Sequence, residues 1–301
     1  MKPLISVVIP TYQRRDKLKV TLDSVLSQTY ENYEVLIMDD GSTDGTKEMV
    51  NSYSDPRIFY NWQENTGGPA KPRNNGIKIS KGSWIAFLDD DDNWKKNKLD
   101  EICGQIHSNN DFIYHDYSLI LNNKYSNKKI FKSSNLKSPI FNNLLINGNI
   151  IGLSTVVVRK ELLLKINGFN EDVNMAPCAD YNAWLRIAQL TNKFFYLPKN
   201  LSYYNVDNNN MSNQDMTISK RLAIKEFSNF LTYKQKSALE AKLNYQSGSF
   251  NFSKKNYKNA TNLFLSSFKH GDFHIKTKSF VRFSQVLITK VIDNIIKTVF
   301  N

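Results

Sequence analysis

Short apolar runs alternate with amphipathic segments through the first part of the chain. The runs cover residues 4–9, 33–38, 58–60 and 84–88, and the segments between them, such as 18–26, carry apolar residues at helical spacing. Short, almost wholly apolar runs are typical of buried parallel strands. Strands that alternate with helices favour βαβ units around a parallel sheet. The pattern therefore predicts an α/β fold.

The same alternation continues up to about residue 205 with less regularity. A polar stretch rich in Asn, Lys and Ser at 122–138 predicts a hairpin and a mobile surface loop. Further strands are expected at 111–117, 152–159 and 194–197, and further helices at 42–49, 71–79, 99–106, 162–166 and 178–187.

From about residue 208 the strand signals give way to long helical stretches at 238–245, 257–268 and 280–300. We therefore divide the chain into an α/β domain at 1–207 and a helical C-terminal region at 208–301. The last predicted helix is amphipathic. Its apolar face could dock on the first domain, pair with another subunit or lie on a membrane surface. That face comprises Val281, Ile288, Val291, Ile292, Ile295 and Val299, opposite Lys290, Asp293 and Lys297.

The positive charge of the protein belongs mostly to this tail. The net charge is +12, and residues 206–301 hold 15 Lys and Arg against 6 Asp and Glu. A basic tail can attract nucleic acid, an anionic membrane or an anionic substrate, or it can be the solvated surface of Lys-rich helices. The aromatic residues do not interleave with Lys and Arg as a base-stacking platform requires, so we expect no nucleic-acid partner.

The cysteines and the N-terminus bear on the compartment. Cys103 and Cys178 lie far apart without metal-type spacing, which fits a reducing environment. The chain enters its first strand directly after Pro3, without a signal-peptide pattern, and has no run of 18 apolar residues. We expect a cytoplasmic protein, with peripheral contact at the inner face of the membrane as a further option.

Polar residues follow three of the predicted strands at their carboxyl ends. Pro10 and Thr11 follow the first strand, Asp40 ends the second, and the four acids 89–92 follow the strand at 84–88. In open α/β sheets, ligands bind beyond the carboxyl ends of the strands. The fold is therefore expected to bring these side chains to one rim of the sheet.

Four adjacent carboxylates at 89–92 repel one another at the end of a buried strand. A bound cation would offset this repulsion. Carboxylate oxygens suit Mg²⁺ or Mn²⁺, ions that often share their coordination sphere with substrate phosphates. The alternative reading of the four acids alone is a solvated acidic turn.

Several blocks together resemble the family 2 inverting glycosyltransferases. They occur in the order and at the spacing of that family and span roughly residues 4–205. The resemblance implies a GT-A fold and the transfer of a sugar from a nucleotide-diphosphate sugar. The blocks are residues 6–12, 24–30, 35–46, 65–68, 72–77 and 82–92, the last matching the DxD block of the family.

The resemblance also implies roles for individual residues. Asp40 would contact the nucleotide base, and Arg73 would lie near the donor pyrophosphate. A divalent metal, Mn²⁺ or Mg²⁺, would be held by Asp89 and Asp91 with Asp92 in support. Asp90 has the least defined role and is the acid expected to tolerate substitution. The full donor-binding set expected is Pro10, Thr11, Tyr12, Asp40, Arg73 and Asp90.

Inversion requires a carboxylate that takes the proton of the acceptor hydroxyl. Asp180 matches the base of the family at the start of the helix 178–187, although the preceding position, commonly Glu, is Ala179 here. Asp180 could also serve as a helix N-cap. Asn205 and Asp207 replace the Arg and His of a later family pattern, so no donor-gating role is carried over.

The sequence thus favours a metal-dependent inverting glycosyltransferase in bacterial cell-surface polysaccharide or glycoconjugate synthesis. The resemblance implies a nucleotide-sugar donor that is UDP-linked. The acceptor would be a hydroxyl of a glycan or lipid-linked glycan. One alternative is a nucleotidyltransferase, which would need a glycine-rich phosphate loop where residues 10–15 have no glycine. The other is a non-catalytic basic binding protein.

Overall fold

The computed structural model describes residues 2–106, 109–121, 129–206 and 214–299. The chain divides into two compact units, residues 1–210 and 211–301, and each is considered by itself. The domain boundary expected after residue 207 falls within 207–213, outside the described residues, as does Asp207. Residues 122–128 of the polar stretch at 122–138 also lie outside them.

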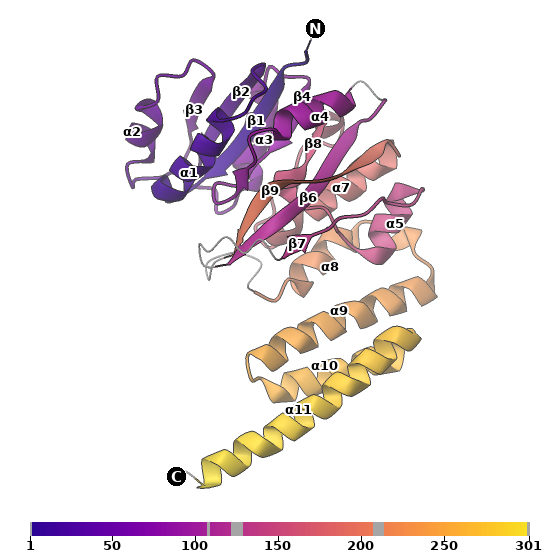
Figure 1. Cartoon of the computed structure of the whole chain (residues 1–301). Helices are drawn as coiled ribbons and strands as arrows, with labels where there is room; N and C mark the ends of the chain where they lie inside the picture. Colours follow the sequence, from indigo (N-terminus) through magenta and orange to yellow (C-terminus); the bar gives the residue numbers. More distant parts are fainter. Residues whose placement is uncertain (1, 107–108, 122–128, 207–213, 300–301) are drawn as a thin grey trace. The chain divides into compact units, whose positions relative to one another are not determined.

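The first unit is built on one mixed sheet (Figure 1). Its strands follow the order β3-β2-β1-β4-β8-β6-β9-β5, and β7 pairs with β6. The strands are β1 (Ile5–Thr11), β2 (Tyr33–Asp39), β3 (Ile58–Trp62), β4 (Trp84–Phe87), β5 (Asn93–Trp94), β6 (Phe112–Leu121), β7 (Ile130–Phe131), β8 (Val157–Arg159) and β9 (Phe194–Val206).

Strands β3, β2, β1 and β4 run parallel, whereas β8 is antiparallel to both β4 and β6. Their register places Thr11 beside Asp39 at the carboxyl ends of β1 and β2. The predicted α/β fold with a parallel half-sheet is confirmed. The parallel strands end on one side, where the polar residues at 11, 39–40 and 89–92 follow them.

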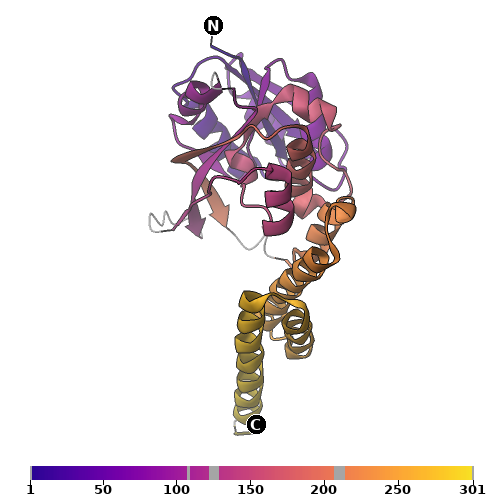
Figure 2. The same cartoon turned by 90° about the vertical axis from the view of Figure 1, so that its right-hand side faces the viewer.

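The helices of the first unit connect these strands (Figures 1 and 2). They are α1 (Arg15–Leu26), α2 (Thr46–Asn51), α3 (Ala70–Ile79), α4 (Lys98–Ile106), α5 (Ile140–Asn147), α6 (Lys160–Lys165) and α7 (Ala179–Leu190), with short 3-10 turns η1 (Leu153–Thr155) and η2 (Ala176–Cys178).

The strand expected at 152–159 is partly wrong, because its first half is the 3-10 turn η1. The carbonyl of Gly152 accepts hydrogen bonds from both the backbone N–H and the hydroxyl of Thr155, which closes a turn before β8 begins. The turn brings Ser154 close to the acidic residues that follow β4. The sequence also gave no signal for α5 or for the short strand β5.

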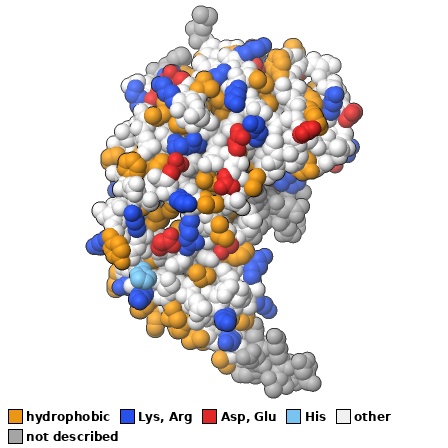
Figure 3. Space-filling view, turned by 180° about the vertical axis from the view of Figure 1, so that it is seen from behind, with side chains coloured by type: hydrophobic (Ala, Val, Ile, Leu, Met, Phe, Trp, Pro, Cys, Tyr) orange, Lys and Arg blue, Asp and Glu red, His pale blue; other side chains and the backbone are white. Residues whose placement is uncertain are grey.

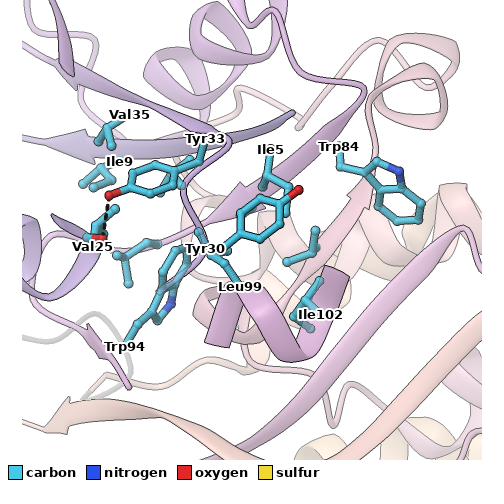
Figure 4. Packing of buried hydrophobic residues seen from close by; sticks show 14 of the residues in the cluster. Ile5, Ile9, Val25, Tyr30, Tyr33, Val35, Trp84, Trp94, Leu99 and Ile102 are labelled. Atoms are coloured by element: carbon cyan, nitrogen blue, oxygen red, sulfur yellow. Dashed lines mark hydrogen bonds between the residues drawn. The ribbon is translucent and has the colours of Figure 1, made fainter. Parts of the chain in front are cut away.

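A buried cluster between the sheet and helices α1 and α4 fixes these elements (Figure 4). The side chains of Ile5, Trp84 and Leu99 are at most 2% exposed. Tyr33 is buried in the same cluster, and its hydroxyl donates to the carbonyl of Val25 at 3.1 Å. Burial of this apolar surface stabilises the strand ends that carry the polar residues.

The second unit contains only helices among its described residues. Helices α9, α10 and α11 pack on one another around Ala260, Phe264 and Val286. Thr232 begins α9 with a capping box in which Gln235 is the reciprocal partner. The helices are α8 (Thr217–Lys225), η4 (Ser228–Phe230), α9 (Tyr233–Ser253), α10 (Tyr257–His270) and α11 (Phe273–Val299). The three tail helices predicted from the sequence exist, and two of them begin earlier than expected.

Candidate active site

The rim of the parallel half-sheet brings together residues from three strand ends. The backbone N–H of Asp40 donates to the carbonyl of Thr11 at 2.9 Å, and the Thr11 hydroxyl donates to the Asp90 carboxylate at 2.8 Å. Pro10 is buried within β1, whereas Tyr12 is 47% exposed. The ends of β1, β2 and β4 are therefore linked by direct hydrogen bonds.

Arg14 pairs with two of the four acids. Its Nη1 atom lies 3.0 Å from both Asp90 Oδ1 and Asp91 Oδ2. Burial, together with the neighbouring charges of Asp89 and Asp90, raises the pKa of Asp91 to about 7, and the charge of Arg14 opposes that shift. Because Asp90 is buried and bonded to both Thr11 and Arg14, the structure gives no support to the expectation that it tolerates substitution.

Ser154 holds the acidic turn from the other side. Its hydroxyl donates to Asp92 Oδ2 at 2.6 Å and accepts from the Asp89 N–H at 3.1 Å. Asp92 is 1% exposed, and its other carboxylate oxygen accepts from the backbone N–H of Asn205 on β9. Asp92 is thus directed into the protein, where it braces the turn.

A buried lysine stands beside this carboxylate. Lys98 is fully buried; its Nζ atom donates to the Ser154 carbonyl at 2.8 Å and lies 3.6 Å from the centre of the Trp94 ring. Burial lowers the pKa of Lys98 well below its usual value, and the charge of Asp92 opposes that shift. Burial also raises the pKa of Asp92 well above its usual value. The two groups partly compensate one another beneath the turn.

Asp40 is tied to the loop that precedes α3. Its carboxylate accepts from the Gln63 side chain at 2.7 Å and from the Thr66 backbone N–H at 3.0 Å and hydroxyl at 2.9 Å. Asp40 is 4% exposed. These bonds fix the loop against the end of β2, at the place where the sequence expects a nucleotide base.

Arg73 joins the two halves of the site. The Nη2 atom of this buried α3 residue lies 2.5 Å from Asp89 Oδ1, and its charge also acts on Asp180. The buried Nε atom has no hydrogen-bond partner among the described residues. A guanidinium with an unsatisfied N–H beside the acidic turn is suited to a phosphate group.

Asp180 lies in the first turn of α7, close enough to Arg73 and Asp89 to interact with both charges. Its Oδ1 atom accepts from the Tyr181 N–H at 2.7 Å, and its Oδ2 atom accepts from Asn149 Nδ2 at 3.2 Å. No side-chain cap bond closes the start of α7, so the N-cap reading of Asp180 does not describe this helix. Burial raises the pKa of Asp180 to about 6, which is suitable for a general base near neutral pH.

This pKa leads to a testable pH dependence. A base must be ionised to accept a proton, so protonation of Asp180 removes activity as the pH falls through about 6. We expect kcat/KM to fall about tenfold per pH unit below that value. The Asn149 N–H stabilises the carboxylate, so Asn149→Ala should move this limb to higher pH. Steady-state rates across a pH series check both; an unshifted limb in Asn149→Ala would show that Asp180 does not control it.

The described residues contain no group of three His, Cys, Asp or Glu side chains arranged to hold a metal ion. Asp89 and Asp91 are the two acids of the turn whose side chains retain some exposure, 31% and 12%. Mg²⁺ is commonly held by one or two carboxylates together with substrate phosphates. Four acids share the Arg14 cation and the Arg73 contact at Asp89, and this excess of acids fits a metal ion shared with a diphosphate, with Asp89 and Asp91 as the protein ligands.

Sequence reasoning missed several residues of this site, among them Arg14, Asn149, Ser154 and Lys98, and it gave Asn205 no role. Asn149 and Ser154 belong to one short segment that touches both the Asp180 carboxylate and the acidic turn. Nothing in the sequence marks this segment, because its contacts depend on the 3-10 turn before β8. Arg14 could have been predicted from the sequence, because it is a cation that closely follows the polar carboxyl end of the first strand.

Ser154→Ala tests the bracing of the turn. The variant leaves the buried Asp92 carboxylate with one hydrogen bond fewer and should lower the free energy of unfolding by about 1–3 kcal/mol. Ser27→Ala is a matched control, because the exposed Ser27 hydroxyl bonds only to the Ser24 carbonyl. Urea denaturation of both variants gives the measurement. Equal stabilities would mean that Ser154 does not support the turn.

Comparison with known proteins decides the family. A model of the family described as "Glycosyl transferase family 2" matches residues 6–166, more than half of the chain. The chain belongs to glycosyl transferase family 2. The match includes the carboxyl ends of β1, β2 and β4. It supports neither of the two alternatives considered from the sequence, a nucleotidyltransferase or a non-catalytic binding protein. The protein is a glycosyltransferase.

Two similar proteins have names that refer to glycan synthesis. "Putative teichuronic acid biosynthesis glycosyltransferase TuaG" of Bacillus subtilis is 31% identical over 223 residues, which are 73% of this chain and 86% of the relative. "UDP-Glc:alpha-D-GlcNAc-diphosphoundecaprenol beta-1,3-glucosyltransferase WfgD" of Escherichia coli is 36% identical over 190 residues, 63% of this chain and 71% of the relative.

A solved structure resembles nearly the whole chain in its fold. Residues 1–349 of S. aureus TarS in complex with UDP-GlcNAc superpose with a TM-score of 0.65 at 21% identity, covering 94% of this chain and 90% of that structure. The likeness confirms the GT-A fold with C-terminal helices. In the described part of this chain, no helix combines the length and apolar character that a membrane span needs.

Proposed function

We propose that this family 2 enzyme transfers a sugar from a UDP-sugar to a hydroxyl of a lipid-linked glycan, with inversion at the anomeric carbon. The observation that carries the proposal is the position of Arg73, which pairs with Asp89 of the acidic turn and acts electrostatically on Asp180. Arg73, which would bind the leaving diphosphate, and Asp180, which would accept the proton of the acceptor, therefore belong to one site.

In this proposal Asp180 accepts the proton of the acceptor hydroxyl while the acceptor oxygen forms its bond to the anomeric carbon. The bond between that carbon and the diphosphate oxygen breaks, and the electron pair leaves with the nucleoside diphosphate. Arg73 and Arg14 lie where they can stabilise this charge. A divalent cation bound at Asp89 and Asp91 would supply Lewis-acid stabilisation of the same leaving group.

The assignment of a uridine donor rests on two proteins. The name of WfgD specifies a UDP-glucose donor, and the structure of TarS was solved with UDP-GlcNAc. In this chain Asp40, held by Gln63 and Thr66, would meet the base at the end of β2. Pro10, Thr11 and Tyr12 would form the remainder of that pocket, beside the buried Asp90.

The acceptor and the location follow from the same relatives. The WfgD description specifies a diphosphoundecaprenol-linked sugar, an acceptor anchored in a membrane by its lipid. We infer a comparable lipid-linked acceptor for this enzyme, in bacterial cell-surface glycan synthesis. The enzyme would then act in the cytoplasm at the inner membrane face, where nucleotide sugars are available.

Isothermal titration with UDP, GDP, UDP-glucose and UDP-GlcNAc, each with Mn²⁺ or Mg²⁺, tests the donor class. The proposal expects the uridine ligands to bind and GDP to bind at least roughly tenfold more weakly, because a larger base must fit the same pocket. It also expects weaker UDP binding without the metal. Preferential GDP binding would overturn the uridine assignment and leave the family unchanged.

A further inference from the structure

Helix α11 has two apolar faces. One face carries Ile275 and Val286, both at most 8% exposed, and packs within the helical unit. The opposite face carries Phe280, Ile288 and Val291, each between 57% and 60% exposed. Spacings of three, eight and eleven residues place these three side chains on one side of a helix. The second face touches α10 through the rings of Phe280 and Phe268, yet its three side chains remain more than half exposed.

The exposed apolar surface extends from α11 onto α10. We define the tail patch as the exposed apolar residues Leu265, Phe268, Phe280, Val281, Leu287, Ile288, Val291 and Ile292. The Phe268 and Phe280 rings lie 6.2 Å apart, which joins α10 to α11. Figure 3 shows hydrophobic side chains together with Lys and Arg on the helical unit. A contiguous exposed apolar patch marks a binding surface.

Basic residues outnumber acidic ones on the helix that carries most of the tail patch: α11 has five Lys and Arg residues and one acid, Asp293. Residues 273–292 contain Lys276, Lys278, Arg282 and Lys290 and no Asp or Glu. Lys276 and Lys290 lie on one side of the exposed apolar face, and Lys278 and Arg282 lie on the other. Long basic side chains in this position can bury their stems in an apolar layer and keep their charges at its polar surface.

We propose that the tail patch binds the surface of an anionic lipid bilayer, with α11 lying in the plane of the interface. The charge distribution selects this occupant over a second copy of the chain. Two copies that paired through this face would bring together two sets of like charges, whereas an anionic bilayer complements them. The inference goes beyond the transfer reaction, and it would place the enzyme on the bilayer that holds a lipid-linked acceptor.

Vesicle flotation of the full chain tests the proposal without donor or acceptor, so its failure leaves the proposed enzyme function untouched. We expect binding to phosphatidylcholine vesicles that contain phosphatidylglycerol, and little binding to phosphatidylcholine alone. Replacing both Lys278 and Lys290 with Gln should weaken binding roughly thirtyfold. Lys234→Gln with Lys236→Gln, the same charge change on exposed residues of α9, should have little effect.

A second pair of variants isolates the apolar contribution. Ile288→Gln with Val291→Gln should abolish vesicle binding, whereas Ile218→Gln, which alters a 66% exposed residue of α8, should not. Circular dichroism and UDP titration verify that each variant is folded. Unchanged vesicle binding in the double variant overturns the proposal. A different result would also overturn it. In that case the unaltered protein does not bind vesicles and is a dimer by sedimentation equilibrium, and the double variant is a monomer.

Discussion

Asp180→Asn is expected to lower kcat by about 10³-fold and leave the affinity for the donor nucleotide within a factor of about two. The amide cannot accept the proton of the acceptor hydroxyl. It has almost the same shape, and its oxygen can still accept the hydrogen bond that the Tyr181 N–H gives to Asp180 Oδ1. The nucleotide is expected to contact other residues, namely Asp40, Arg73 and the acidic turn.

The same variant has a predictable effect on stability. Burial raises the pKa of Asp180 to about 6, so its charge disfavours the folded state at neutral pH, and the neutral amide should raise the free energy of unfolding by about 1–2 kcal/mol. Asp16→Asn is the matched control, because that carboxylate is 85% exposed on α1 and should leave kcat unchanged. Rates come from nucleoside diphosphate release and affinities from calorimetry. Full activity in Asp180→Asn would exclude Asp180 as the base.

Asp91→Asn is expected to lower kcat by about 10²–10³-fold and to raise the metal concentration that gives half-maximal rate. The neutral amide is a weaker ligand than a carboxylate, so the charge that forms on the diphosphate is less well stabilised. Arg14 keeps its bond to Asp90, so the turn should remain folded. Initial rates measured over a Mn²⁺ titration give both quantities.

Asp23→Asn is the control for this variant. Its carboxylate is 51% exposed on α1 and pairs with Lys19, and it makes no hydrogen bond to the described residues of the acidic turn. It should reproduce the metal dependence of the unaltered enzyme. If Asp91→Asn had the same metal dependence as Asp23→Asn, the cation would not be bound at the acidic turn, or would not be needed.

The sequence was a good guide to the parts of the site that follow directly from strand order. Parallel strands all end on the same side, so residues 11, 40 and 89–92 had to meet once the βαβ pattern was recognised. The position of Asp180 came from the resemblance to the family, because periodicity alone placed it at a helix start without saying what that helix faced.

What the sequence could not supply was the second layer of contacts around the acids. Ser154 acts through a turn that was predicted as a strand, since Leu153-Ser154-Thr155 leads without a break into the valines of β8. Asn149 precedes that turn, in a segment to which the sequence assigned no role. The burial of Asp90 was also missed. Four identical acids look equivalent in a sequence, and only the structure distinguishes Asp90 and Asp92, which are buried and hydrogen-bonded, from the more open Asp89 and Asp91.

The tail shows the same limit. Helical periodicity predicted all three long helices and an apolar face on the last one, but left three possible partners for that face. The structure separates two apolar faces on α11: the one that includes Val286 is buried against neighbouring helices of the unit, and the one that includes Ile288 is largely exposed. The periodicity of one helix cannot say which of its faces is covered, because that depends on helices elsewhere in the chain.

The most direct test of the proposed reaction is the anomeric configuration of its product. The purified enzyme would be given a UDP-α-sugar, a divalent metal and a synthetic diphosphate-lipid-linked sugar, and the new glycosidic bond would be examined by NMR. The account predicts a β-linked product and release of UDP, with both greatly reduced in Asp180→Asn. An α-linked product would contradict the assignment of Asp180 as the base of an inverting displacement.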